Sequence, residues 1–153
     1  MYSNADPKTP SILLVGLNHR TAPIDVREQL SFDACALPMV AHDLFSLGAK
    51  QGVLQEVVVI STCNRLEVYA VTATPPLAAP LIEAQIAHQR QAKPDALRAY
   101  LYIQSGDAAI DHLFRVASGL DSLILGEAQI LGQVAHALAS AQSSGASGPI
   151  LTQ

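Results

Sequence analysis

The sequence predicts an α+β domain: a ferredoxin-like plait, in which helices cover one face of an antiparallel sheet, followed by two C-terminal helices. The chain has 153 residues, the usual length of one domain. Half of them are hydrophobic and only 14% are charged, which is enough apolar material for one core. Two adjoining strand-like runs lie mid-chain with helical patterns on either side, which gives the order β-α-β-β-α-β.

The first part of the chain predicts one strand and two helices. Residues 1–10 are a polar lead-in, and the apolar run over 11–19 indicates a strand. The segment 21–32 is expected to start a short helix at Pro23, because proline is tolerated in the first turn. Apolar residues recur at helical spacing over 33–50, which predicts a second helix.

The middle of the chain predicts a hairpin, with strands over 56–61 and 65–73 joined by a short polar break. In the second strand, apolar and polar residues alternate with a period of two, which is typical of a half-buried strand. The two alternating sets are Leu66, Val68 and Ala70, and Arg65, Glu67 and Tyr69.

The last part of the chain predicts three helices and one strand. A helix is expected over about 77–91, an aromatic strand within 96–106, and a helix over 106–119. The final helix runs from near residue 127 to 142, and 143–149 is a breaker. The last two helices are expected to lie outside the plait. The buried stripe expected on the helix over 106–119 comprises Ile110, Leu113, Phe114 and Ala117.

Composition and charge exclude several classes of protein. The net charge of −4 argues against broad, non-specific nucleic-acid binding, which needs a basic surface. No apolar run approaches the roughly 18 residues of a membrane span, and the N-terminus does not resemble a signal peptide. A cytoplasmic protein with both cysteines reduced is therefore expected. No GxGxxG or P-loop pattern occurs, so no nucleotide site is expected in this chain.

Cys63 lies in the break between the two hairpin strands, where loop tips are usually exposed. Cysteine is most often a buried and inert core residue. At a loop tip, however, the nearby Arg65 guanidinium would favour the thiolate, which is the nucleophilic form. The residues alone leave both interpretations open. Cys35, at a helix start, is interpreted as structural.

Two polar features on the last helices are weaker candidates. His112 lies opposite the expected apolar stripe of its helix, so it should face water or a cleft, where it could move a proton or orient a group. Gln129, Gln133 and His136 share one face of the last helix, with Glu127 in its first turn. These residues are explained if this face of the helix is simply exposed to solvent. The alternative is that they form hydrogen bonds with a polar ligand. No spacing of histidines or cysteines suggests a metal site.

Three segments together closely resemble a known family. They are "VGLNHRTAPIDVREQLSF", "VVVISTCNRLEVYAV" and "HLFRVASGLDSLILGEAQILGQV", in the family's order. The family is glutamyl-tRNA reductase, and the resemblance is to its N-terminal catalytic domain. It implies NADPH-dependent formation of glutamate-1-semialdehyde from glutamyl-tRNA, the first committed step of tetrapyrrole (porphyrin) biosynthesis. The Cys63 thiolate would attack the ester to form a thioester, which is then reduced.

The resemblance also implies roles for individual residues. Cys63 matches the family's nucleophile and His112 its catalytically important histidine. The implied substrate contacts are Thr62, Asn64, Arg65, Ser122, Glu127, Gln129 and Gln133. Two positions depart from the family's pattern, because Ala128 replaces a common proline and Leu66 an often-seen threonine.

The resemblance places the catalytic domain at residues 11–142 and the start of a connector at 143–153. An NADPH-binding domain and a dimerising C-terminal helix would follow in a longer chain, so this chain should form the thioester without reducing it. Neither a cofactor nor a metal is expected here. The implied partners are glutamyl-tRNA and the aminomutase that uses the product, with no membrane. A non-catalytic RNA-binding module and a thiol hydrolase are the alternatives, and the lack of paired strand aromatics speaks against the module.

Overall fold

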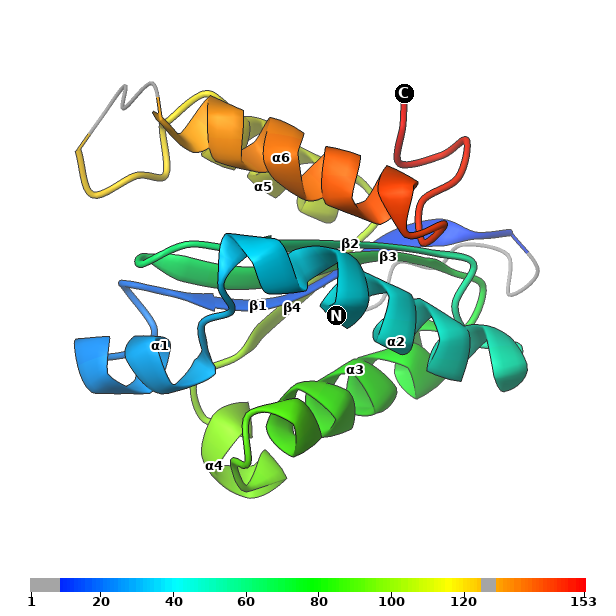
Figure 1. Cartoon of the computed structure of the whole chain (residues 1–153), viewed down its shortest axis with the longest axis horizontal. Coiled ribbons are helices and arrows are strands. Elements are labelled where there is room, and N and C mark those ends of the chain that lie inside the picture. The colour runs from blue at the N-terminus through cyan, green and yellow to red at the C-terminus, as the bar shows by residue number, and fades with distance from the viewer. Residues whose placement is uncertain (1–8, 125–128) are drawn as a thin grey trace.

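The computed structural model describes residues 9–124 and 129–153. Strands and helices are interspersed along the chain (Figure 1). In order, the elements are β1 (Ser11–Asn18), α1 (Ile24–Leu30), a 3₁₀ turn (Ala34–Ala36), α2 (Leu37–Lys50), β2 (Glu56–Ser61), β3 (Arg65–Thr72), α3 (Pro75–Gln89), α4 (Pro94–Arg98), β4 (Tyr102–Ser105), α5 (Asp107–Ala117) and α6 (Gln129–Ser143).

The four strands form one antiparallel sheet in the order β2-β3-β1-β4. This confirms the predicted α+β class and the antiparallel hairpin of β2 and β3. In the central pair, Asn18 at the end of β1 lies opposite Arg65 at the start of β3. The end of β1, the β2–β3 hairpin tip and the start of β3 therefore meet at one end of the sheet, and this end carries the candidate site.

Helices cover both faces of this sheet. Figure 1 shows α2, α3 and α4 on one side, and α5 and α6 on the other. The two C-terminal helices therefore form a third layer. No helix among the described residues is long and apolar enough to cross a membrane.

This third layer overturns the prediction that β3 is half-buried, because every residue of β3 is buried. The polar set on its second face is enclosed as well: Arg65 is 2% exposed and Glu67 is not exposed at all. The polar and apolar residues of β3 do alternate with a period of two. The polar face, however, is covered by other residues and does not face solvent.

The orientation of α5 also differs from the prediction. Phe114, expected in the buried stripe, is 69% exposed, whereas Ala109 and Val116 are fully buried. The helix is thus turned so that its small Ala109 approaches the sheet, and His112, one turn further on, faces the sheet too.

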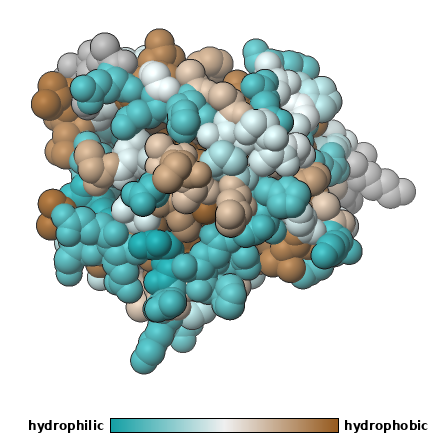
Figure 2. All heavy atoms as spheres, viewed as in Figure 1, coloured by the Kyte–Doolittle hydropathy of each residue, from teal (hydrophilic) through white to brown (hydrophobic). Residues whose placement is uncertain are grey.

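Figure 2 shows that the surface mixes polar and apolar patches. Large exposed apolar residues around the α5–α6 connection are Phe114, Leu120, Leu123, Ile124 and Leu131.

The strand expected within 96–106 is shorter than predicted. Residues Pro94–Arg98 form the helix α4, and only Tyr102–Ser105 pair as β4. Pro94 is pre-organised for the first helical position, and Asp95 in the first turn complements the helix dipole. These two residues start a helix where the apolar pattern alone indicated a strand.

The C-terminal segment packs along the outer edge of β2. The Val57 N–H donates to the Ala146 carbonyl at 2.8 Å. The Glu56 carboxylate accepts from the N–H groups of Ile150 at 2.9 Å and Leu151 at 2.7 Å. The first of these bonds uses a backbone N–H that an open sheet edge would present to other chains.

Candidate functional site

The hairpin tip that carries Cys63 is ordered by Thr62. The Thr62 hydroxyl accepts from the N–H groups of Asn64 at 3.1 Å and Arg65 at 3.2 Å. The Thr62 N–H in turn donates to the Arg65 carbonyl at 2.9 Å. Cys63 between them is exposed, as predicted from its place in the break. The tip is therefore a fixed turn that presents a free thiol to solvent.

Arg27 of α1 holds the same tip from outside, a contact that was not predicted from the sequence. Its Nη1 donates to the Cys63 carbonyl at 2.8 Å and to the Asn64 side-chain oxygen at 3.2 Å. Its Nε also donates to the Ala22 carbonyl at 3.2 Å, which fixes the guanidinium. A cation thus lies against the turn that carries the thiol.

Arg65 is buried beneath the tip and paired with two carboxylates. Its Nη1 lies 3.0 Å from Glu67 Oε1 and 3.0 Å from Asp121 Oδ2, and its Nη2 donates to the Asp121 carbonyl at 2.7 Å. Burial alone would lower the pKa of the guanidinium, but the charges of Glu67 and Asp121 raise it above its usual value. The positive charge of Arg65 is therefore compensated by two carboxylates inside the fold. The prediction that this guanidinium favours the Cys63 thiolate did not take that pairing into account.

Glu67 is the acceptor at the centre of this cluster. Besides Arg65, it accepts from the hydroxyl of Tyr69 at 2.8 Å and that of Tyr102 at 2.5 Å. Its Oε1 lies 2.6 Å from His112 Nε2. Burial alone would raise the pKa of Glu67, but the His112 hydrogen bond and the Arg65 charge lower it below its usual value. Glu67 is therefore a buried carboxylate kept ionised by its donors.

The groups around Glu67 are fixed as hydrogen-bond donors. Burial and the Glu67 charge raise the pKa of both Tyr69 and Tyr102 far above the ordinary value, so both phenols stay protonated. An ionised carboxylate only accepts, so the facing ring nitrogen, His112 Nε2, is assigned a proton. The His112 side chain is 13% exposed and lies beside the Tyr102 ring, with 5.3 Å between ring centroids. The expectation that His112 points away from its helix's buried face is wrong.

Asp121 joins the end of β1 to the same cluster. Its carboxylate accepts from Arg20 at 2.8 Å and, more weakly, from the Asn18 side chain at 3.4 Å. His19, between these two residues, has a buried Nδ1 without a partner among the described residues. Burial and the charges of Arg20 and Arg65 lower the pKa of His19, so it is held neutral near pH 7.

The predicted contacts on the C-terminal half fall into two places. Ser122 is buried and directly follows Asp121, the residue that pairs with Arg65. Gln129 and Gln133 are exposed on α6 and line a separate cavity of about 400 Å³ with Ser61 at the end of β2. Glu127 lies outside the described residues. The structure thus brings His112 and Arg65 together on Glu67, and it sets the two glutamines on a separate pocket.

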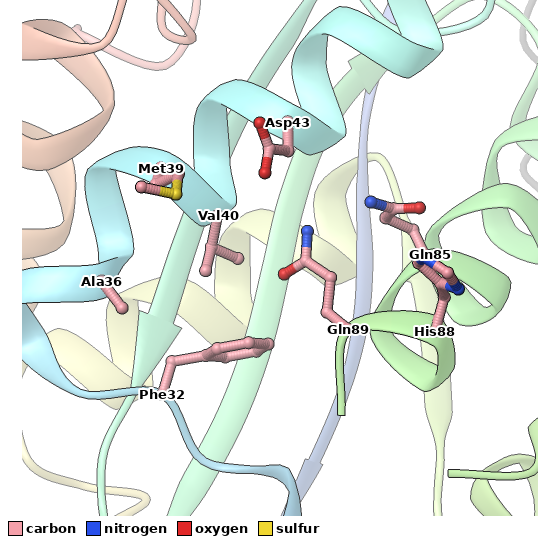
Figure 3. Close-up of a pocket in the computed structure, with 8 residues that line it drawn as sticks. All are labelled: Phe32, Ala36, Met39, Val40, Asp43, Gln85, His88 and Gln89. Carbon is pink, nitrogen blue, oxygen red and sulfur yellow. The ribbon is translucent and has the colours of Figure 1, made fainter. Parts of the chain in front are cut away.

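A larger cavity, of about 490 Å³, lies between α2 and α3. Figure 3 shows Met39, Val40 and Phe32 on one side of it and Gln85 and Gln89 of α3 on the other. None of the predicted site residues that the structure describes lines this cavity. No group of three or more metal-ligating side chains occurs among the described residues.

A protein-family model described as "Glutamyl-tRNAGlu reductase, N-terminal domain" matches residues 15–153. The chain belongs to this family. A glutamyl-tRNA reductase of Geobacillus thermodenitrificans is 44% identical over 140 residues, covering 92% of this chain and 30% of the relative. One of Syntrophotalea carbinolica is 41% identical over 143 residues, covering 94% and 31%.

The fold of this reductase-family domain has a solved counterpart. The structure of glutamyl-tRNA reductase from Methanopyrus kandleri matches with a TM-score of 0.68 at 29% identity, covering 92% of this chain and 30% of that one. The resemblance seen in the sequence is thereby confirmed. The chain spans about 30% of the length of these relatives.

Sequence reasoning missed Glu67, Asp121 and Arg27, and gave little weight to His19. One sequence signal could have pointed to Glu67. It is a glutamate between apolar strand residues, and a glutamate in a strand that is covered on both faces is rarely buried without a partner. Asp121 lies within the "GLDS" stretch that carried the family resemblance. Arg27 offered no local signal, since its contacts at the hairpin tip lie 36 and 37 residues away in the sequence.

Proposed function

We propose that this chain is the part of a glutamyl-tRNA reductase that takes the glutamyl group from its tRNA onto Cys63. Family membership supports the class of reaction. The observation that carries the proposal is the exposed Cys63 thiol on a fixed turn, beside a buried cluster that contains His112. A presented thiol is a good nucleophile towards an activated ester once it loses its proton.

The first step is acyl transfer. The Cys63 sulfur attacks the ester carbonyl, a C–S bond forms, and the C–O bond to the tRNA breaks. The terminal ribose oxygen leaves and takes up the proton that the thiol gave up. We propose that His112 moves this proton through Nδ1, because Nε2 is engaged by Glu67. Glu67 is then a positioning residue, which fixes the ring and its tautomer.

The predicted substrate contacts remain proposals. We retain Thr62, Asn64, Ser122, Glu127, Gln129 and Gln133 as groups near the substrate. For Arg65, we propose that a substrate carboxylate reaches only the N–H groups that Glu67 and Asp121 do not use. Selection for glutamate would follow, because other side chains would leave those buried donors without a partner.

Reduction of the thioester belongs to the complete protein. This chain has no dinucleotide-binding glycine pattern, so its residues do not match an NADPH-binding site. We therefore propose no hydride transfer by this chain. When bound elsewhere in the protein, NADPH would supply the hydride that releases glutamate-1-semialdehyde for tetrapyrrole synthesis. We propose residues 143–153 as the start of the connector to that part. Dimerisation through a later helix, contact with the aminomutase and a cytoplasmic location are likewise proposed.

We also propose that the fold is a ferredoxin-like plait. The order β1-α2-β2-β3-α3-β4, with the strands arranged as β2-β3-β1-β4, supports this finer class. The helices α5 and α6 are then an addition that covers the second face and encloses the polar side of β3.

The test is transfer of labelled glutamate from glutamyl-tRNA to the protein. We expect acid-stable label on the wild type and on Cys35→Ser, and none on Cys63→Ser. The two cysteines are matched, because both are free and exposed. Equal labelling of Cys63→Ser would refute the proposal. Steady release of free glutamate by the wild type would instead indicate a thiol hydrolase.

A further inference from the structure

Arg27 contacts the hairpin tip from α1, which lies at the end of the sheet where β2 and β3 are joined (Figure 1). The proposed reaction gives this side chain no role. Its two contacts at the tip, however, are with the residue that carries the nucleophile and with Asn64, a predicted substrate contact. The geometry of these contacts indicates what Arg27 does.

The peptide unit that joins Cys63 to Asn64 is held at both ends. Its N–H donates to the Thr62 hydroxyl at 3.1 Å, and its carbonyl accepts from Arg27 Nη1 at 2.8 Å. Because a peptide unit is planar, fixing both groups fixes the rotation of the whole unit. The Cys63 side chain branches from the backbone directly beside this unit, so the direction of the thiol depends on the bond from Arg27.

The same guanidinium orients the Asn64 side chain. Arg27 only donates, so the Asn64 atom at 3.2 Å from its Nη1 is assigned as the amide oxygen. The amide nitrogen of Asn64 then remains as a donor for the substrate. One side chain therefore sets the orientation of the nucleophile and of a neighbouring polar contact.

Arg27 is itself tied to the end of the sheet. Its Nε donates to the Ala22 carbonyl at 3.2 Å, and the Ala22 N–H donates to the Asn18 carbonyl at 2.9 Å. Asn18 ends β1 and lies opposite Arg65 at the start of β3. The guanidinium is thus held by the framework that also positions the hairpin.

The acceptors of Arg27 are all neutral oxygens, and it forms no ion pair within residues 9–124 and 129–153. Arg65 differs, because it pairs with two carboxylates. Substituting Arg27 therefore leaves no carboxylate of the described cluster without a counter-charge, and the fold should tolerate the change.

We propose that Arg27 is a positioning residue for the transfer of the glutamyl group, because it fixes the direction in which the Cys63 thiol meets the ester carbonyl. The inference rests on the proposed acyl transfer, and in it Arg27 acts through the turn and not on the substrate. A thiol that can turn away from the line of attack reacts more slowly with a bound ester. A small reagent that approaches from any side needs no such alignment.

The test compares two reactions of the Cys63 thiol in a Cys35→Ser background, which leaves a single cysteine. One is acylation by glutamyl-tRNA, and the other is alkylation by iodoacetamide, both followed by the intact mass of the protein. For Arg27→Ala, we expect the acylation rate constant at saturating glutamyl-tRNA to fall about tenfold, as for a lost charge-assisted hydrogen bond. The half-saturating concentration and the alkylation rate constant should not change.

Chemical rescue separates positioning from a general loss of structure. Guanidinium chloride at low concentration should restore part of the acylation rate of Arg27→Ala, whereas sodium chloride at the same ionic strength should not. Arg27→Lys keeps the charge and the aliphatic stem but lacks the planar fork that reaches three acceptors. It should therefore fold normally and still acylate slowly.

Arg90→Ala is the matched control. Arg90 also donates from its Nε to a backbone carbonyl at α1, that of Gln29 at 2.9 Å, but it has no hydrogen bond to the hairpin tip among the described residues. Both reactions of Cys63 should be unchanged in this variant. A loss of acylation equal to that of Arg27→Ala would overturn the inference, because any disturbance of α1 would then have the same effect.

The remaining outcomes distinguish the inference from the proposed function. Normal acylation by Arg27→Ala or Arg27→Lys, or an equal fall in acylation and alkylation, would overturn the inference alone. A raised half-saturating concentration or a lack of rescue by guanidinium in Arg27→Ala would overturn it too. If wild-type Cys63 reacts with iodoacetamide but is not acylated, the proposed function fails and this inference with it.

Discussion

At the scale of single residues, Glu67 decides how the candidate site is built. A fully buried carboxylate is costly unless it is paired and hydrogen-bonded. Glu67 meets this condition with Arg65, His112 and two tyrosine hydroxyls. The same contacts that make its burial tolerable hold the imidazole in one orientation. Stability and the proposed chemistry are therefore linked through one side chain.

This link predicts a pH-dependent effect of Glu67→Gln. The folded-state pKa of Glu67 is lowered from 4.5, so its ionised form stabilises the fold above about pH 4.5, and that stabilisation is lost as pH falls through the folded-state pKa. Breaking the buried pair should cost about 3 kcal/mol at pH 7. Urea denaturation of both proteins should show this gap narrowing below about pH 4. A gap of equal size at pH 7 and at about pH 3 would contradict the ionised state assigned to Glu67.

The residue scale also shows what the sequence could not provide. The exposure of Cys63 followed from its place between two strands, which is a local property. The contacts of Arg65 with Asp121 join residues 56 positions apart, and those of Glu67 with His112 join residues 45 apart. Pairing over such separations is decided by tertiary packing, so a single sequence gave the residue types without their partners.

At the scale of elements, the close approach of β1 to β3 depends on Gly16. A Cβ at this position would lie 2.8 Å from Glu67 Cγ and 2.9 Å from the Leu66 carbonyl oxygen. Gly16→Ala should therefore destabilise the protein by about 1–3 kcal/mol, because the central strands must move apart. Chemical denaturation measures the change.

Gly132 provides the matched comparison for Gly16. It lies within α6, and a Cβ there would meet no atom within 4 Å. Gly132→Ala should stabilise the protein by about 0.5–1 kcal/mol, because alanine loses less backbone entropy in a helix. Equal destabilisation by Gly16→Ala and Gly132→Ala would contradict the claim that the short distances from Gly16 to β3 determine the cost of adding a Cβ.

Periodicity predicted most elements, because strand and helix patterns are local. Periodicity failed to predict which face of an element is buried where another layer of the structure covers that element. For β3, a buried polar face looked like a solvated one, since both show polar residues at every second position. For α5, the largest apolar residues suggested the buried face, but small Ala109 packs inside and Phe114 does not. Which of two plausible faces is buried depends on the partner layer.

At the scale of the whole molecule, the C-terminal segment closes the outer edge of the sheet. The Glu56 carboxylate accepts from the N–H groups of Ile150 and Leu151, which lie 94 and 95 residues further along the sequence. Glu56→Ala should therefore release this segment while the sheet persists. Hydrogen exchange should show faster exchange at Ile150 and Leu151, with little change in the central strands. Exposed Glu28 is the control, since Glu28→Ala should change neither.

The central claim is that the turn between β2 and β3 presents Cys63 to an activated glutamate. The most direct measurement mixes the protein briefly with glutamyl-tRNA, quenches in acid, and locates the added glutamyl group by tandem mass spectrometry. We predict that the group is found on the peptide that contains Cys63, and that the peptide containing Cys35, which is also exposed, is unmodified. A glutamyl group on Cys35, or on neither cysteine, would contradict the claim.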